Sequence, residues 1–230
     1  MLDIDCAGWR MRLLSSGAVH LPDIATLLVA DAHFGKAVSF RARGVPVPHG
    51  TTSETLQRLT EAAAQTQSKQ LIFLGDFLHS AHAHAAPTQQ ALADWRSQHP
   101  QLAITLVRGN HDDHAGDPPA SLGIRVVDEP FVVPGLTGGG VPLALCHHPQ
   151  AVTGAYVLAG HAHPCVVLNG AGKERLRLPC FVLGDVATNA AGVLPAFGSF
   201  TGMHPIERVA GDRVFAVAGS TVREVPALRS

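Results

Sequence analysis

The sequence has little of several features that would assign it to a particular class of protein. Only 5% of its 230 residues are aromatic, with a single Tyr and two Trp, so we expect a core built mainly of Ala, Val and Leu. Charged residues make up 15%, and the formal net charge is -1. Such a balance creates no overall basic field that would attract nucleic acid, so any contact with a polyanion must be local.

Cysteine is also scarce, and the chain lacks segments typical of secreted or membrane proteins. The four cysteines form no Cys-x-x-Cys pair, and a chain of this length needs no disulfide to fold, so we expect reduced thiols. The N-terminus has no basic segment followed by an apolar one. No apolar run approaches the roughly 20 residues needed to cross a bilayer. These absences predict a soluble cytoplasmic protein that does not enter a membrane.

Histidine, by contrast, is abundant, with 14 residues. Imidazole is the commonest metal ligand and the usual proton carrier near neutral pH. A bias in composition explains most of these histidines, but a few follow apolar segments in a way that indicates a function.

The first half of the chain alternates apolar segments with amphipathic ones. The predicted strands cover residues 8–14, 18–21, 25–30, 71–74 and 103–107. The last three are apolar without alternation, as in sheets that are covered on both faces. Segments that begin near Thr51 and at Thr88 have apolar residues at helical spacing and predict two helices. We expect 34–48 and 79–84 to be loops. This order is typical of a parallel α/β sheet.

Beyond Gly116 the pattern changes to short strands between turns rich in Gly and Pro. The predicted strands cover residues 124–127, 131–133, 143–146, 155–159, 165–168, 176–178, 180–183 and 214–217. They indicate a second sheet. No linker, repeat or low-complexity segment separates the two halves, so we expect a single domain over residues 1–230.

Polar residues that can bind a metal follow five of the predicted strands. These strand ends are Asp31-Ala32-His33, Gly75-Asp76, Gly109-Asn110-His111-Asp112, His147-His148 and Gly160-His161-Ala162-His163. In open α/β sheets, ligands bind in the crevice at the carboxyl ends of the strands. Each motif alone has an alternative interpretation as a polar turn. Five of them in succession predict one shared site.

The ligand types indicate which ions this site would bind. Carboxylate, imidazole and one amide oxygen, without thiolate, suit Mn²⁺, Fe or Zn²⁺ better than they suit a structural zinc site. The set of predicted ligands is larger than a single catalytic ion with a free coordination position needs. We therefore expect two divalent ions, with Mn²⁺ as the first choice, about 3.5–4 Å apart and bridged by a shared carboxylate. Asp76 is the expected bridge, because its strand lies between the strands that end in Asp31 and Asn110.

These motifs resemble the ordered motif set of the calcineurin-like metallophosphoesterases, from Asp31 to His163. The resemblance implies an α/β (α+β) fold in which a two-sheet β-sandwich is flanked by helices. It implies that the first ion is held by Asp31, His33, Asp76 and His163. It implies that the second ion is held by Asp76, Asn110, His147 and His161. For the second ion the resemblance favours His147 over its neighbour His148.

Further segments, at 28–37, 43–48, 146–149 and 193–202, are similar to the ligase-associated phosphoesterases of bacterial DNA-damage responses. That narrower resemblance implies a DNA substrate and an endonuclease activity in DNA repair, alongside a DNA ligase and a helicase. A phosphodiesterase or phosphatase for small nucleotides is the alternative, since the chain is not basic overall. A non-catalytic scaffold is a third hypothesis, but scaffolds lose ligands, and every expected ligand is present here.

The remaining site residues are predicted from the needs of phosphodiester hydrolysis. Two cations would activate a water and neutralise the phosphate, and the departing alkoxide needs a proton. We expect His111 to supply this proton, because it follows the expected ligand Asn110. Asp112 would orient His111 or, alternatively, cap the turn. Lys36 and Arg43 are candidates for contacts with substrate phosphates, with a solvated surface position as the alternative.

Overall fold

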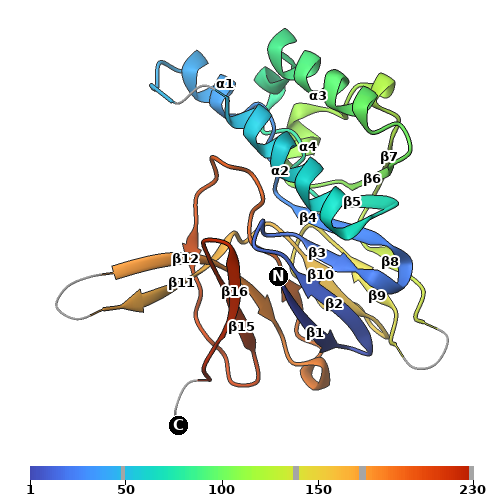
Figure 1. Ribbon diagram of the computed structural model, residues 1–230, viewed down its shortest axis with the longest axis vertical. Helices are drawn as coiled ribbons and strands as arrows, with labels where there is room; N and C mark the ends of the chain where they lie inside the picture. Colours follow the sequence, from blue (N-terminus) through green and yellow to red (C-terminus); the bar gives the residue numbers. More distant parts are fainter. Residues whose placement is uncertain (48–49, 137–139, 171–174, 228–230) are drawn as a thin grey trace.

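The computed structural model describes residues 1–47, 50–136, 140–170 and 175–227, and it contains two β-sheets with helices packed outside the first (Figure 1). The first sheet has the order β1-β2-β3-β4-β5-β6-β7. Its strands are β1 (Leu2–Cys6), β2 (Trp9–Leu13), β3 (Val19–Leu21), β4 (Thr26–Ala30), β5 (Gln70–Leu74), β6 (Ala103–Val107) and β7 (Ile124–Val127). From β4 to β7 the pairing is parallel, which confirms the predicted parallel α/β half.

The second sheet is built from the chain from Phe131 onward, as predicted. Residues 124–127, which we also expected in this sheet, instead form β7 of the first sheet, because they pair in parallel with β6. Its strands are β8 (Phe131–Val133), β9 (Leu143–Leu145), β10 (Tyr156–Ala159), β11 (Pro164–Asn169), β12 (Arg175–Leu183), β13 (Gly192–Val193), β14 (His204–Pro205), β15 (Arg213–Ala218) and β16 (Thr221–Val225). Strands β8 and β9 are antiparallel, whereas β9, β10 and β13 are mutually parallel. The parallel strands β9 and β10 therefore end at the same edge of this sheet.

Strand β4 is apolar on both faces because a different layer of the molecule covers each face. Leu27 and Val29 pack in a core cluster with residues of the helix α2 (Thr51–Thr66). Leu28 and Ala30 point the other way, into a cluster shared with the second sheet. Because successive side chains of a strand point to opposite faces, both faces must be apolar. Burial of each leucine contributes about 1.5–3 kcal/mol to holding the layers together.

Two short helices lie in segments that we expected to be irregular. Helix α1 (Lys36–Ala42) occupies the middle of the predicted loop 34–48, whose last residue, Pro48, lies outside the described residues. Helix α4 (Asn110–Ala115) begins within the predicted turn at Asn110. Both are too short to show a clear helical period in the sequence. Helices of normal length, α2 and α3 (Ala86–Gln98), form where they were predicted.

Strand β12 joins two segments that we had predicted as separate strands on either side of Pro179. Residues 175–179 pair with β11, and residues 180–183 pair with β15. Pro179 pairs with Cys165 at the end of the β11 ladder, and the strand changes partners directly after it. All four cysteines are free thiols, as predicted. Among the helices of the described residues, none combines the length and the apolar composition that spanning a membrane requires.

Candidate metal centre

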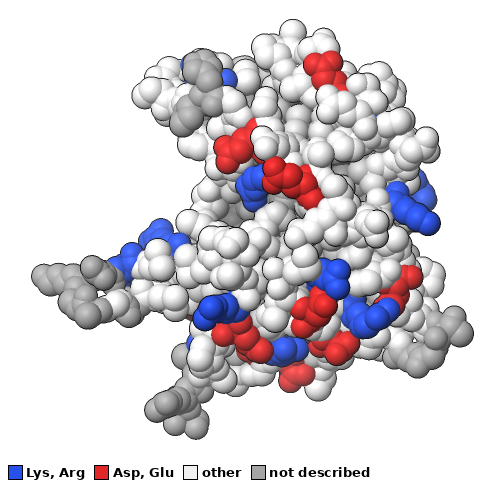
Figure 2. Space-filling view, viewed as in Figure 1, with Lys and Arg blue, Asp and Glu red and all other residues white. Residues whose placement is uncertain are grey.

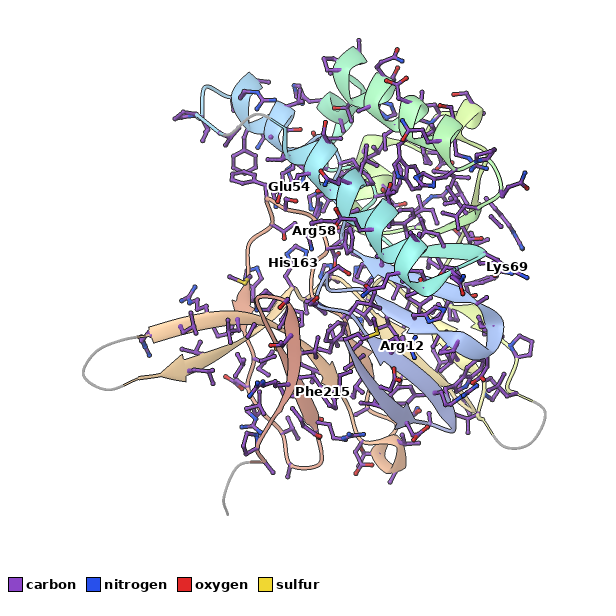
Figure 3. The ribbon with its side chains drawn as sticks, viewed as in Figure 1. Arg12, Glu54, Arg58, Lys69, His163 and Phe215 are labelled. Carbon is purple, nitrogen blue, oxygen red and sulfur yellow. The ribbon has the colours of Figure 1, made fainter. Side chains whose placement is uncertain are left out.

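The predicted ligands come together where strands of the two sheets end. Asp31 follows β4, Asp76 follows β5, and Asn110 begins α4 just after β6. From the second sheet, His147 follows β9, and the segment after β10 carries His161 and His163. In Figure 3, the labelled His163 lies on the side of the molecule where the α2 layer and the second sheet approach each other. The site thus lies between the two halves of the chain.

One half of the cluster surrounds His33. Its Nε2 lies 3.3 Å from Nε2 of His163 and 3.6 Å from Oδ2 of Asp76. Nε2 of His163 in turn lies 3.6 Å from Oδ1 of Asp31. These are the four residues that the resemblance assigned to the first ion.

The other half surrounds His147, whose side chain is fully buried. Its Nε2 lies 2.8 Å from Oδ1 of Asn110, 3.0 Å from Nδ1 of His161 and 3.4 Å from Oδ1 of Asp76. Its other nitrogen, Nδ1, lies 3.1 Å from the carbonyl oxygen of Leu74. A backbone carbonyl in this position fixes the ring and leaves Nε2 as the free ligand atom.

Asp76 connects the two halves. Its Oδ2 is the oxygen near His33, and its Oδ1 is the oxygen near His147. Ligands bound to one ion at about 2.0–2.2 Å lie roughly 3–3.5 Å from one another. The donor pairs given above lie 2.8–3.6 Å apart, close to this spacing, and Asp76 belongs to pairs in both halves of the cluster.

The charges of the cluster also fit divalent cations. Asp31 is 0% exposed and Asp76 is 2% exposed. Among the described residues, the ion pairs of both carboxylates within 4 Å are to histidines and to no lysine or arginine. Buried charges are costly unless they are paired or bind a metal. Groups of three side chains suited to holding an ion include Asp31, His33 and His163, and also Asp31, Asp76 and His147.

The backbone at the site adopts a conformation that most residues avoid. The φ angles are 54° at Asp31, 45° at His33, 49° at Asp76, 68° at His161 and 45° at His163. These five are among only nine non-glycine residues with positive φ in the described chain. Each costs of order 1–2 kcal/mol in the left-handed region. Such strain concentrates at functional sites, where the rest of the fold holds it in place.

Two glycines make room for the ligands. A Cβ on Gly75, where φ is +77°, would lie 2.1 Å from Nδ1 of His147. A Cβ on Gly109 would lie 2.6 Å from Oδ1 of Asp76. Neither position can carry a side chain without displacing a ligand, which explains the Gly-Asp and Gly-Asn pairs in the sequence.

His111 and Asp112 lie at the site, but they do not contact each other as we predicted. Nδ1 of His111 lies 2.7 Å from the carbonyl oxygen of His79. The Asp112 carboxylate instead accepts backbone N–H groups of Phe77, Leu78 and Gly109 at 3.0–3.3 Å. These contacts favour the alternative of a turn cap for Asp112, and the orienting role stays a prediction without a direct contact to support it. A buried carboxylate at the start of α4 satisfies these N–H groups better than it could serve a half-exposed ring.

Two further residues belong to the site and were not predicted. His79, expected in an exposed loop, stacks on His111 with ring centroids 5.0 Å apart, and its Nδ1 lies 3.4 Å from Nδ1 of His33. Burial, with Lys36 nearby, lowers the pKa of His79 to about 4. Glu129 holds the backbone at His147 from the segment between β7 and β8. Nothing in the sequence near Glu129 identifies it, because its partners lie 18 and 19 residues away.

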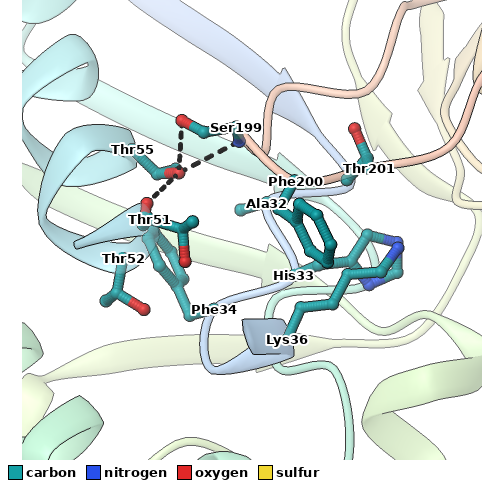
Figure 4. Close-up of a pocket in the computed structure, with 10 residues that line it drawn as sticks. All are labelled: Ala32, His33, Phe34, Lys36, Thr51, Thr52, Thr55, Ser199, Phe200 and Thr201. Atoms are coloured by element: carbon teal, nitrogen blue, oxygen red, sulfur yellow. Dashed lines mark hydrogen bonds between the residues drawn. The ribbon is translucent and has the colours of Figure 1, made fainter. Parts of the chain in front are cut away.

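The candidate phosphate-binding residues occupy different surroundings. Lys36 lines a small pocket beside His33, together with hydroxyl side chains from α2 and the segment 199–201 (Figure 4). Burial lowers the pKa of Lys36. Arg43 is exposed at the end of α1. The structure thus places Lys36 beside the predicted ligand His33, whereas Arg43 is exposed but close enough to His79 to help lower the pKa of that imidazole.

A family model and one solved structure identify the family of this chain. The family model described as calcineurin-like phosphoesterase matches residues 24–179. The crystal structure of Pseudomonas putida nuclease MPE is 43% identical over 97% of this chain and 99% of that chain, with a TM-score of 0.83. The phosphoesterase Yfce from E. coli is 14% identical over 86% of this chain and 90% of that chain, with a TM-score of 0.40. No curated protein matches the sequence. The chain belongs to the calcineurin-like phosphoesterase family.

Proposed function

We propose that the protein is a two-metal phosphodiesterase that cleaves DNA, and that it acts in DNA repair. The observation that carries the proposal is the position of Asp76, whose two oxygens face separate groups of donors. The similarity to a protein described as a nuclease supports nucleic acid as the substrate class. A repair setting with a ligase and a helicase rests on the narrower sequence resemblance.

In this proposal each ion has four protein ligands, and the two sets share Asp76. The first ion binds Asp31, His33, Asp76 and His163. The second ion binds Asp76, Asn110, His147 and His161. Mn²⁺ is the first choice for both sites, because oxygen and imidazole ligands without thiolate suit it. When bound, the cations supply Lewis acidity that polarises the phosphate and makes a water more acidic.

The chain's own residues would handle the leaving group. Because Nδ1 of His111 donates to the carbonyl of His79, Nε2 is the atom that can hold and release a proton. This Nε2 lies 3.9 Å from Oδ2 of Asp76, at the edge of the donor cluster. The side chain is 37% exposed, so a substrate can reach it. We propose that His111 protonates the departing alkoxide.

Lys36 would contact a phosphate oxygen beside the first ion. Its ammonium is partly buried next to His33, where a negative group would offset the cost of desolvation. The visible face of the molecule carries interspersed acidic and basic side chains instead of a continuous basic surface (Figure 2). This distribution favours a few local contacts, and it keeps a small nucleotide diester as the second candidate substrate.

The proposal is tested with purified protein on bis(p-nitrophenyl) phosphate and p-nitrophenyl phosphate, each with and without Mn²⁺. Single-stranded and double-stranded DNA of the same sequence follow. We expect Mn²⁺-dependent cleavage of the diester and of DNA, and loss of both on addition of a chelator or in Asp76→Asn. Cleavage of nucleotide diesters but not of DNA would favour the second candidate. Full metal loading without turnover of any phosphoester would contradict both and favour a scaffold.

A further inference from the structure

Glu129 makes three hydrogen bonds to two adjacent residues of the metal centre. Its Oε2 accepts the backbone N–H of His147 at 2.6 Å and the backbone N–H of His148 at 2.9 Å. Its Oε1 lies 2.7 Å from Nδ1 of His148. The carboxylate therefore binds both the turn that follows β9 and one of the rings that this turn carries.

The turn needs such an anchor because His147 contacts more of the donor cluster than its neighbours do. Its Nε2 alone approaches Asn110, His161 and Asp76, so a small rotation of the backbone would break several contacts. The carbonyl of His147 is held by the N–H of Gly160 at 3.1 Å. The N–H on the other side of the same residue is held by Glu129, which fixes the peptide planes on both sides.

The same carboxylate also orients the second ring. Since Nδ1 of His148 donates to Glu129, Nε2 of His148 carries the lone pair. The His148 ring centroid lies 4.6 Å from that of His161 and 4.7 Å from that of His147. These three rings form one of the groups suited to an ion, in which His147 is buried, His148 is partly buried and His161 is exposed.

We propose that Glu129 is a positioning residue for the second divalent cation, acting through the His147–His148 turn. This inference rests on the proposed two-metal function. Carboxylates that hold metal-binding histidines from outside typically account for about 10–100-fold in metal affinity. The first ion has no ligand on this turn, so its affinity should not depend on Glu129. Selective weakening of one of two sites is the signature of this role.

The test is Mn²⁺ binding, measured by equilibrium dialysis with detection of free Mn²⁺ by electron paramagnetic resonance (EPR). Wild type should bind two ions. Glu129→Ala should weaken the second ion about 10–100-fold and leave the first unchanged. Glu129→Gln should retain wild-type affinity within a few-fold, because its amide oxygen can accept both backbone N–H groups and its NH₂ can donate to the other tautomer of His148. Circular dichroism reports whether each variant folds.

Asp128→Ala is the matched control, since Asp128 is the preceding residue and pairs with Arg108 away from the turn. It should bind both ions as wild type does. The inference is overturned if Glu129→Ala binds the second ion as tightly as wild type, if Asp128→Ala loses as much affinity, or if Glu129→Gln is as weak as Glu129→Ala. If Glu129→Ala does not fold, Glu129→Ser takes its place, with the same expected weakening of the second ion and the same contradicting outcome. A wild type that binds fewer than two ions would instead contradict the proposed function.

Discussion

At the scale of single residues, the residues of the site differ in how the fold positions them. Asp31, Asp76 and Asn110 each follow an apolar strand, and the shared edge of a parallel sheet brings them together. Glu129 has no such pattern, because it acts through backbone N–H groups of residues distant in sequence. Hydrogen bonds of this kind depend on the tertiary fold alone.

Asp112 allows its two predicted roles to be separated by experiment. Asp112→Asn replaces one acceptor oxygen with an NH₂ group facing backbone N–H groups that are otherwise buried. We expect a loss of about 1–3 kcal/mol in the free energy of unfolding, measured by urea denaturation. The pH dependence of kcat in the folded variant should match wild type. A displaced pH profile at unchanged stability would restore the orienting role.

His111 should matter in proportion to how poor the leaving group is. An alkoxide leaving from DNA needs a proton, whereas p-nitrophenolate leaves readily without one. His111→Ala should therefore lower kcat on DNA by about 10²–10⁴-fold. The loss on bis(p-nitrophenyl) phosphate should be much smaller. The measurement is the ratio of the two kcat losses, and equal losses on both substrates would argue against a proton donor.

At the scale of helices and strands, the sequence predicted an element correctly where the element is long and its apolar residues recur at a regular spacing. Helix α2 buries Leu56 and Leu59 on one face, and this spacing is visible in the sequence. Helix α1 is held largely by contacts that no local pattern encodes, such as the hydrogen bond at 2.7 Å between the hydroxyls of Ser39 and Ser80. Short elements near the site therefore could not be predicted from the sequence.

Strand β3 contains a buried histidine, His20, that makes the stability of the fold depend on pH. His20 is 5% exposed, and neither of its ring nitrogens has a hydrogen-bond partner among the described residues. Burial, aided by Arg12, lowers the pKa of His20 below 6.5 in the folded protein. The unfolded chain then binds more protons, so the stability contributed by neutral His20 is complete above about pH 6.5 and falls as the pH decreases.

Replacing this ring tests the argument. His20→Phe should raise the melting temperature relative to wild type more at pH 5.5 than at pH 8. The reason is that the unfolded variant can no longer gain stability by binding a proton at position 20. Comparison with wild type at each pH cancels the contribution of the other histidines. Thermal unfolding followed by circular dichroism gives both differences. Equal differences at the two pH values would show that His20 protonation does not affect stability.

At the scale of the whole molecule, the site depends on how two sheets pack. The parallel sheet contributes Asp31, His33, Asp76 and Asn110, and the second sheet contributes His147, His161 and His163. Five motifs in order predicted that these residues converge. How closely the end of β4 approaches the segment after β10 could not be predicted from the sequence. In the structure, the backbone N–H of His161 lies 2.9 Å from Oδ2 of Asp31. That contact belongs to the assembled sandwich, in which Leu28 of β4 and Leu158 of β10 share one core.

The central claim is that Asp76 joins two cations in one site. The most direct measurement combines metal analysis with EPR of the Mn²⁺-loaded protein, wild type against Asp76→Asn. We predict two Mn²⁺ per chain with a spin-coupled signal in wild type, and loss of the coupling together with at least one ion in Asp76→Asn. A wild type that holds a single uncoupled ion, or an Asp76→Asn variant that keeps a coupled pair, would contradict the account.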